Sequence, residues 1–242
     1  MLDERSRLAK ARKIVALVEA DRALRGLRVL EVGCGSGFIA RELDLRVGPK
    51  GSFAAVDVVD VRCAYGFEYS LYSGERLPFD DAAFDVVISN HTIEHVGDGP
   101  RQAAHAAEIA RVLAPGGLVY FACPNRWFPW EAHYRLPFLG WLPRSLADTY
   151  VTATGRGEAF DVYPLSRRGA VSLLRNAGLA VRDRTPEAVV FTLRPGADLG
   201  RRRGLLRILL APLTSLMPTL IVIATKRPDQ NGPGQSTSAR PA

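Results

Sequence analysis

A glycine-rich turn, GCGSG at 33–37, constrains this chain more than any other feature. The residues before it, RVLEV (28–32), form an apolar, β-branched run typical of a buried strand. The residues after it, FIARELDLRV (38–47), have the apolar spacing of a helix. Glycines at such a turn let the backbone approach a ligand closely, and the first amides of a helix are free to bind one. The turn therefore predicts a ligand site between a first strand and a first helix.

The glycine spacing argues against a dinucleotide fingerprint. That fingerprint requires a glycine three positions beyond Gly35, and Phe38 stands there. The next apolar run, SFAAVDV (52–58), predicts a second strand ending near Asp57. A carboxylate at that position can accept hydrogen bonds from both hydroxyls of a ribose. The turn and the acid together predict a site for a ribose-containing cofactor, and the simpler alternative is a tight turn with an ordinary capping acid.

Strand and helix patterns alternate along the rest of the chain. Further strands are predicted at FEYSLYS, FDVVIS, LVYFACP, LAVRDR and LIVIAT, and further helices at 3–24, 101–113 and 166–178. Helices of this length between strands imply a mostly parallel, doubly wound α/β sheet of the Rossmann-like kind, with helices on both faces. Ligands of such sheets bind at the carboxyl ends of the strands, so functional residues are expected to follow strands.

Four segments carry a resemblance to a known family. They are VLEVGCGSG, AVDV, SGERLPFDDAAFDVVISNHTIEHV and EIARVLAPGGLVYFACPN. In their order and spacing, from about Arg28 to Pro124, the chain resembles the class I S-adenosylmethionine-dependent methyltransferases, specifically the subgroup that includes quinone-biosynthesis methyltransferases. The resemblance implies an enzyme, a methyltransferase, with S-adenosyl-L-methionine as its cofactor.

The resemblance also implies a set of cofactor-binding residues near the ends of successive strands. In this set Glu31 supports the loop and the methionyl end of the cofactor, Asp57 holds the ribose, and Asn90 lies close to the reacting methyl group. In many relatives an acid reaches the adenine amino group from a position that Ser73 occupies here, so Gly74 and Glu75 are expected to serve in its place. The full set is Glu31, Gly33, Gly35, Gly37, Asp57, Val58, Gly74, Glu75 and Asn90.

Methyl transfer from a sulfonium mainly requires that the acceptor be aligned and water excluded, and a hydroxyl acceptor must also lose a proton. The candidate bases are His91, His95 and His133, with Glu94 beside them, because histidine titrates nearest neutrality. If the chain is helical from Thr92 onward, His91, Glu94 and His95 share one face and can also make a divalent-metal site or be purely structural. We assign no metal from the sequence.

The sequence predicts an N-terminal helix (1–27), a methyltransferase domain (28–227) and a disordered tail (228–242). Within the domain, residues 125–163 are expected to form a lid insert, because they are rich in proline and contain all three tryptophans. These tryptophans either stack on an acceptor or pin the insert onto the core.

The sequence predicts a cytoplasmic protein. Its three cysteines are odd in number and far apart, which argues against a disulfide framework, and its first residues are charged where a signal peptide is apolar. The apolar stretch 204–225 contains Arg207 and two prolines, which favours a core helix followed by a strand over a membrane span. A weak peripheral contact of 201–217 with an anionic membrane is the alternative.

The acceptor is the least determined feature. We expect O-methylation of a small or lipid-linked acceptor. The net charge of +7 is compatible with a nucleic-acid methyltransferase, but SNHT after the fourth strand is not the NPPY or DPPY of enzymes that methylate base amino groups. The non-enzymatic alternative is a regulator that binds the cofactor without catalysis, and only Ser73, which departs from the family pattern, favours it.

Overall fold

The computed structural model describes residues 4–193, 214 and 217–228 and contains a seven-stranded sheet in the order β3-β2-β1-β4-β5-β9-β8. Neighbouring strands from β3 to β5 are parallel, and β9 runs antiparallel to both β5 and β8. This topology confirms the predicted mostly parallel, Rossmann-like sheet. The strands are β1 (Arg28–Val32), β2 (Ser52–Asp57), β3 (Glu68–Leu71), β4 (Phe84–Asn90), β5 (Leu113–Pro124), β8 (Leu179–Asp183) and β9 (Thr219–Lys226).

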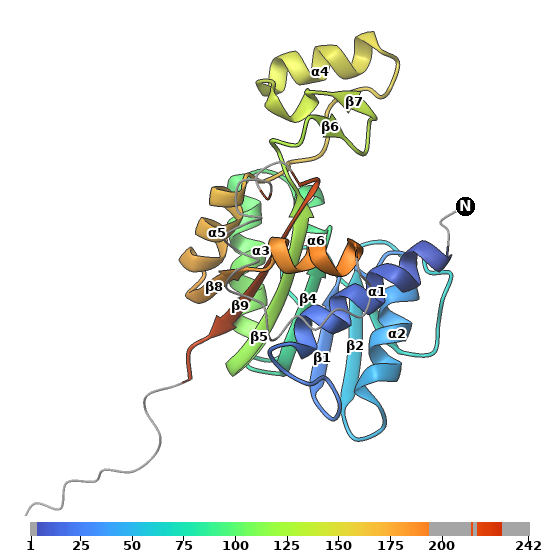
Figure 1. Cartoon of the computed structure of the whole chain (residues 1–242), viewed down its shortest axis with the longest axis vertical. Helices are drawn as coiled ribbons and strands as arrows, with labels where there is room; N and C mark the ends of the chain where they lie inside the picture. Colours follow the sequence, from blue (N-terminus) through green and yellow to red (C-terminus); the bar gives the residue numbers. More distant parts are fainter. Residues whose placement is uncertain (1–3, 194–213, 215–216, 229–242) are drawn as a thin grey trace, which may run out of the picture.

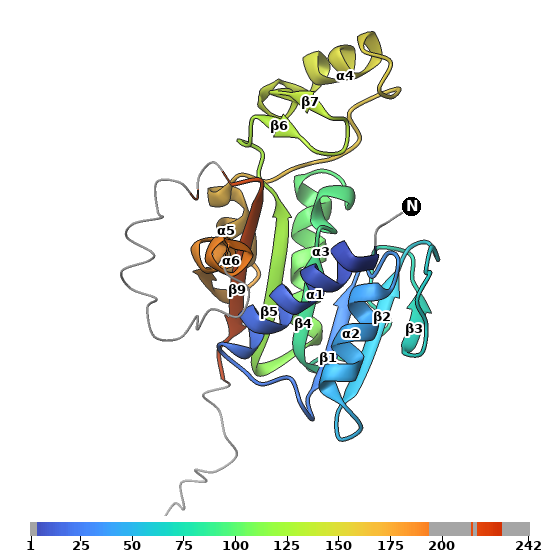
Figure 2. The same cartoon turned by 45° about the vertical axis from the view of Figure 1, so that its right-hand side comes forward.

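Helices cover both faces of the sheet (Figures 1 and 2). One face carries α1 (Glu4–Glu19), α2 (Phe38–Val47) and α6 (Thr185–Leu193), and the other carries α3 (Gly99–Val112) and α5 (Arg167–Asn176). Each face buries its own apolar cluster against the sheet. The central strands β1 and β4 lie between both clusters, which explains why their sequences are nearly continuous apolar runs.

The ends of the helices on the second face follow from local chemistry. Asp98 accepts a hydrogen bond from the amide of Arg101 at the start of α3, and Pro100 occupies the first turn, where its missing N–H costs nothing. Ser166 accepts a hydrogen bond from the amide of Gly169 and caps α5. Gly178 follows that helix with φ of 83°, a conformation that favours glycine.

The structure departs from the sequence-based elements in three places. The first helix ends at Glu19 rather than near residue 24, and β5 begins at Leu113, with a shift in its register against β4. The stretch between LAVRDR and LIVIAT contains a helix, α6, which the sequence analysis did not predict. The predicted helix at 204–216, the membrane contact at 201–217 and the tail beyond Pro228 lie outside the described residues. Within the described ranges, no helix is both long and apolar enough to cross a bilayer.

Residues 125–163 form a small lobe beyond the carboxyl end of β5, at the top of Figure 1. The lobe contains β6 (Trp130–Glu131), β7 (Leu136–Pro137), the 3-10 turn η2 (Leu139–Trp141) and α4 (Arg144–Ala153). It encloses an apolar cluster separate from the two that flank the sheet, formed by Leu136, Leu139, Ala147, Val151, Phe160 and Val162. The lobe therefore has a core of its own at the edge of the sheet where ligands are expected.

Candidate active site

A cavity of about 880 Å³ opens at the carboxyl ends of the central strands. The chain runs outward from β1 to β2 and β3, and then returns to place β4 on the other side of β1. Open α/β sheets bind ligands at such a reversal of strand order. The cavity is lined by Gly33, Gly35, Asp57, Val58, Val61, Tyr72, Ser73, Gly74, Glu75, His91, Thr92, His95, Val96, Arg101, Ala104 and His105.

Asp57 holds the glycine loop against the end of the second strand. Its Oδ2 accepts a hydrogen bond of 2.8 Å from the amide of Gly35, and its Oδ1 accepts one of 2.8 Å from the amide of Val58. Each carboxylate oxygen keeps a further lone pair for a ligand. The side chain is therefore fixed at the cavity wall with acceptor capacity to spare, as recognition of a ribose diol requires.

Glu31 places a second carboxyl group beside the same loop. The side chain is 1% exposed, and its Oε2 has no hydrogen-bond partner among the described residues. Burial raises the pKa of Glu31 well above its usual value, repulsion from Asp57 raises it further, and Arg7 on α1 opposes both effects. A cationic ligand near the loop would relieve this strain, whereas the two phosphates of a dinucleotide would be repelled by both carboxylates.

The three glycines of the loop differ in the space that surrounds them. A Cβ on Gly33 would lie 2.3 Å from Oγ1 of Thr92, and one on Gly37 would lie 2.5 Å from the carbonyl oxygen of Ala64, so both are packed against other segments. A Cβ on Gly35 would meet no described atom within 4 Å and would project at a cavity-lining position, with φ of 51°. Gly35 is thus the glycine whose missing side chain keeps space for a ligand.

We expect Gly35→Ala to fold and to bind the cofactor about tenfold more weakly or worse, a loss of about 1.4 kcal/mol in binding free energy. The left-handed backbone adds a stability cost of about 1–2 kcal/mol. Gly178→Ala is the matched control, because Gly178 also has a positive φ, of 83°, and open space around an added Cβ but lies outside this cavity. Calorimetric titration and thermal unfolding of both variants check the prediction, and equal affinities for the two variants would contradict it.

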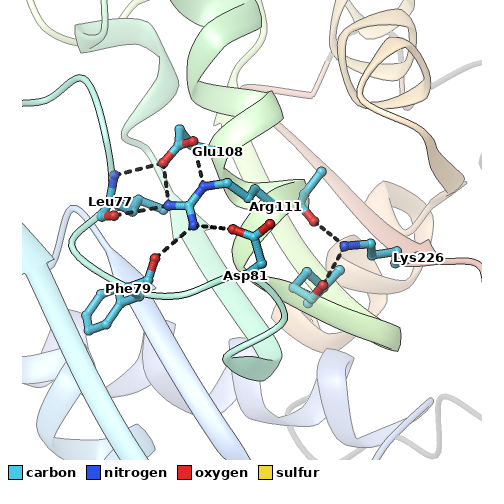
Figure 3. A network of polar contacts seen from close by, with 8 residues as sticks. Leu77, Phe79, Asp81, Glu108, Arg111 and Lys226 are labelled. Carbon is cyan, nitrogen blue, oxygen red and sulfur yellow. Dashed lines mark hydrogen bonds and ion pairs between the residues drawn. The ribbon is translucent and has the colours of Figure 1, made fainter.

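An arginine on α3 anchors the segment that follows the Ser73–Glu75 wall of the cavity (Figure 3). The guanidinium of Arg111 donates to the carbonyls of Leu77 and Phe79 and to the carboxylates of Asp81 and Glu108. Glu108 in turn accepts from the amide of Leu77, and its hydrogen bonds with Arg111 lower the pKa of its carboxyl group. The network fixes this loop to the same helix whose other end lines the cavity.

The three histidines predicted as candidate bases gather at the side of the cavity that faces the lobe. His91 and His95 line the cavity, and the ring of His133 packs edge-on against that of His95 with 5.1 Å between centroids. Nδ1 of His133 lies 2.7 Å from Oε1 of the buried Glu131, and this bond raises the pKa of His133. His91 has φ of 56°, an uncommon backbone for a residue with a side chain.

Glu94 lies next to these rings and is completely buried. The predicted helix from Thr92 is a single 3-10 turn, η1 (Ile93–His95), so the one-face geometry expected for His91, Glu94 and His95 is wrong. Oε1 of Glu94 still lies 3.3 Å from Nδ1 of His91. The residues come together through tight local backbone and through the lobe rather than through a helix.

Most of the predicted cofactor residues reach the cavity. Gly33, Gly35, Asp57, Val58, Gly74 and Glu75 line it, whereas Glu31, Gly37 and the nearly buried Asn90 are not among the lining residues. Arg101 and His105, which were not predicted from the sequence, reach the cavity from α3. Burial lowers the pKa of His105 to about 4, so this ring is neutral at physiological pH. A helix face toward the sheet edge was the only sequence signal that could have identified them.

None of the three tryptophans of the lobe is buried. Trp127, Trp130 and Trp141 remain 49%, 50% and 44% exposed, so they do not pin the lobe onto the core of the domain. Trp141 contacts the rings of both Trp127 and Phe138 edge-on, and Arg126 stacks over Trp127. The lobe therefore presents an accessible aromatic surface.

Comparison with known proteins shows what the fold and the sequence of this chain are similar to. The fold is similar to that of a crystal structure of an S-adenosylmethionine-dependent methyltransferase from Mesorhizobium loti, with a TM-score of 0.57 and 19% identity over 87% of this chain and 96% of that one. Residues 30–121 match the family described as "Methyltransferase domain". The resemblance of the sequence to the class I S-adenosylmethionine-dependent methyltransferases is thereby confirmed.

Among curated proteins, the chain is similar to O-methyltransferases of ubiquinone biosynthesis. The chain is 31% identical over 140 residues to the ubiquinone biosynthesis O-methyltransferase of Parvibaculum lavamentivorans, a region covering 53% of this chain and 54% of that protein. It is 30% identical over 138 residues to the protein of the same name from Brucella ovis, covering 52% and 53%. The chain thus spans about half the length of the curated relatives it matches.

Proposed function

We propose that this chain is an S-adenosylmethionine-dependent methyltransferase that methylates an oxygen of a small or lipid-linked acceptor. The observation that carries the proposal is the pair of carboxylates at the glycine loop. Asp57 offers acceptors for a ribose diol, and Glu31 is a buried acid whose Oε2 lacks a partner among the described residues. The cofactor carries a ribose and two cationic groups, an ammonium and a sulfonium. The ribose suits the acceptors of Asp57, and a cationic group suits the unpartnered carboxyl oxygen of Glu31.

S-adenosylmethionine, when bound, supplies a methyl group that is already electrophilic, so the chain must orient the partners, exclude water and manage one proton. In this proposal Asp57 positions the ribose, Val58 flanks the adenine, and Ser73, Gly74 and Glu75 close the wall beside it. Asn90 ends β4 next to the expected methyl position. His91, His95 and His133 are the groups available to accept the proton of a hydroxyl, and the bond of His133 to Glu131 leaves Nε2 of that ring free.

The lobe of residues 125–163 supplies the acceptor side in this proposal. Its half-exposed tryptophans offer apolar stacking surface to a ring or a hydrophobic tail, and the curated relatives named above are O-methyltransferases of ubiquinone biosynthesis. Nucleic acid remains the less favoured acceptor. A cytoplasmic location is part of the proposal and is supported by three cysteines that are free thiols.

Calorimetry and a transfer assay test the proposal. We expect S-adenosylmethionine and its demethylated product to bind and a nicotinamide dinucleotide not to bind. Methyl-labelled cofactor is then incubated with lipid, glycan, small-molecule and nucleic-acid fractions, and label is expected in the lipid or small-molecule fraction as an ether. If no cofactor binds at millimolar concentration, the assignment of S-adenosylmethionine as the cofactor is wrong. If the label appears in nucleic acid, the acceptor is a nucleic acid and not a small or lipid-linked molecule.

A further inference from the structure

We propose that Glu94, His95 and His133 bind a divalent transition-metal cation, of the Zn²⁺ type, at the acceptor side of the cavity. One ligand atom from each side chain lies within 4.8 Å of the other two. Ligand atoms that lie about 2.0–2.1 Å from a tetrahedral zinc ion are about 3.3–3.4 Å apart, so the side chains have to close by up to about 1.5 Å, which changes of side-chain torsion angles can supply. The role of this cation in catalysis rests on the proposed function, but its binding does not.

Glu94 supplies the strongest indication of a missing partner. Its side chain is 0% exposed, and in the described part of the chain neither carboxylate oxygen accepts a hydrogen bond. Its neighbour His91, at 3.3 Å, is positive only when protonated. A carboxylate buried without donors is costly, and a cation coordinated by its oxygens would remove that cost.

His133 is already oriented as a metal ligand. Its Nδ1 lies 2.7 Å from Oε1 of Glu131, whose Oε2 accepts a 2.7 Å hydrogen bond from the amide of Tyr134. Donation from Nδ1–H leaves the lone pair of Nε2 free to coordinate. Carboxylate–histidine–metal arrangements of this kind fix the tautomer and orientation of ligating histidines, so Glu131 is a positioning residue.

His95 connects this group to the cofactor cavity. It lines the cavity and packs against His133 through perpendicular rings. The ligands also come from two parts of the fold, since His133 belongs to the lobe and the other two to the turn after β4. A bound cation would therefore tie the lobe to the domain beside the space where an acceptor must enter, and the two exposed histidines leave a path for it.

The donor set indicates the kind of cation. Two imidazoles and one carboxylate suit Zn²⁺ and its first-row neighbours, whereas Mg²⁺ prefers oxygen ligands alone. Three protein ligands leave coordination positions open, as in catalytic zinc sites, and an acceptor hydroxyl placed there would be polarised and more acidic. Two of the three candidate bases would then act as ligands.

Cobalt is the probe for this site, because Co²⁺ replaces Zn²⁺ and absorbs visible light when imidazole and carboxylate ligands enclose it. The full-length protein, stripped with a chelator, is titrated with Co²⁺. We expect ligand-field bands in the wild type and in His91→Gln, no bands in His133→Ala, and affinity about 10–100-fold weaker in Glu131→Gln. Mg²⁺ in excess should not displace Co²⁺, whereas Zn²⁺ should.

Lack of bands in the wild type at millimolar Co²⁺ would overturn the proposal, as would bands that persist in His133→Ala or vanish in His91→Gln. His133 is a side chain of the lobe and 31% exposed, so its variant tests the site even if Glu94→Gln fails to fold. Titration of the chelator-treated protein with S-adenosylmethionine tests the proposed function separately. A protein that binds Co²⁺ but not S-adenosylmethionine would refute the proposed function and leave the metal site standing. A protein that binds S-adenosylmethionine but not Co²⁺ would refute only the metal site.

Discussion

Replacement of Asp57 by alanine is expected to weaken S-adenosylmethionine binding by about 2 kcal/mol or more, which is roughly a 30-fold increase in Kd. Two losses contribute. The ribose loses its charge-assisted acceptors, and the glycine loop loses the bond between Oδ2 and the amide of Gly35. Isothermal titration with the cofactor measures the change directly.

The stability of this variant should change little. Repulsion from Asp57 contributes to the raised pKa of Glu31, so removal of Asp57 relieves an unfavourable interaction as it removes two hydrogen bonds. Glu68→Ala, an exposed acid on the neighbouring strand β3, is the matched control for loss of one negative charge. Binding by Asp57→Ala within about twofold of the control would show that the carboxylate does not hold the ribose.

The fold and the glycine-loop side of the cavity could be predicted from the sequence, because both depend on short-range patterns. The glycine turn and Asp57 each follow an apolar run directly, and the carboxyl ends of parallel strands meet at one edge of a sheet. To predict that the glycine turn and Asp57 lie close together, only the order of the strands had to be correct. The family profile also covers these segments, since it spans 30–121.

The group of histidines beside the lobe could not be predicted in the same way. His133 and His95 meet only because the lobe folds back toward the turn after β4, and no periodicity in proline-rich residues predicts that contact. The helical spacing suggested His91 as the partner of Glu94 and His95, but the backbone makes a single 3-10 turn there. Local backbone still brings His91 to within 3.3 Å of the buried Glu94, whereas only the tertiary fold brings His133 to it.

Similarity to known proteins carries little information about the acceptor, because it does not extend over the whole lobe. The matched family region ends before the lobe begins, and the curated relatives share only about half their length with this chain. Side chains that contact an acceptor lie largely in the lobe under the proposal. Function on a shared fold is determined by such local residues, so the acceptor has to be argued from the lobe and its histidines.

Glu31→Gln is expected to make the protein more stable and a poorer binder of its cofactor at the same time. Glutamine is nearly isosteric and uncharged, so it removes the cost of ionising a buried acid beside Asp57. A gain on the order of 1 kcal/mol would raise Tm by roughly 2–4 °C in a domain of this size. Cofactor affinity should fall by about tenfold, because the ammonium or sulfonium loses its anionic neighbour.

The pH dependence distinguishes this account from a simple packing effect. The pKa of Glu31 in the folded state lies above its unfolded value of about 4.3, so the folded state holds the proton more tightly. Stability of the wild type therefore decreases as pH rises from that value through the folded pKa, whereas Glu31→Gln lacks this decrease. The difference in Tm between the two proteins should vanish near pH 4 and should grow as the pH rises from about 4.3 toward the folded pKa. A difference independent of pH would mean that the pKa of Glu31 is the same in the folded and unfolded states, so that neither burial nor Asp57 disfavours its charged form.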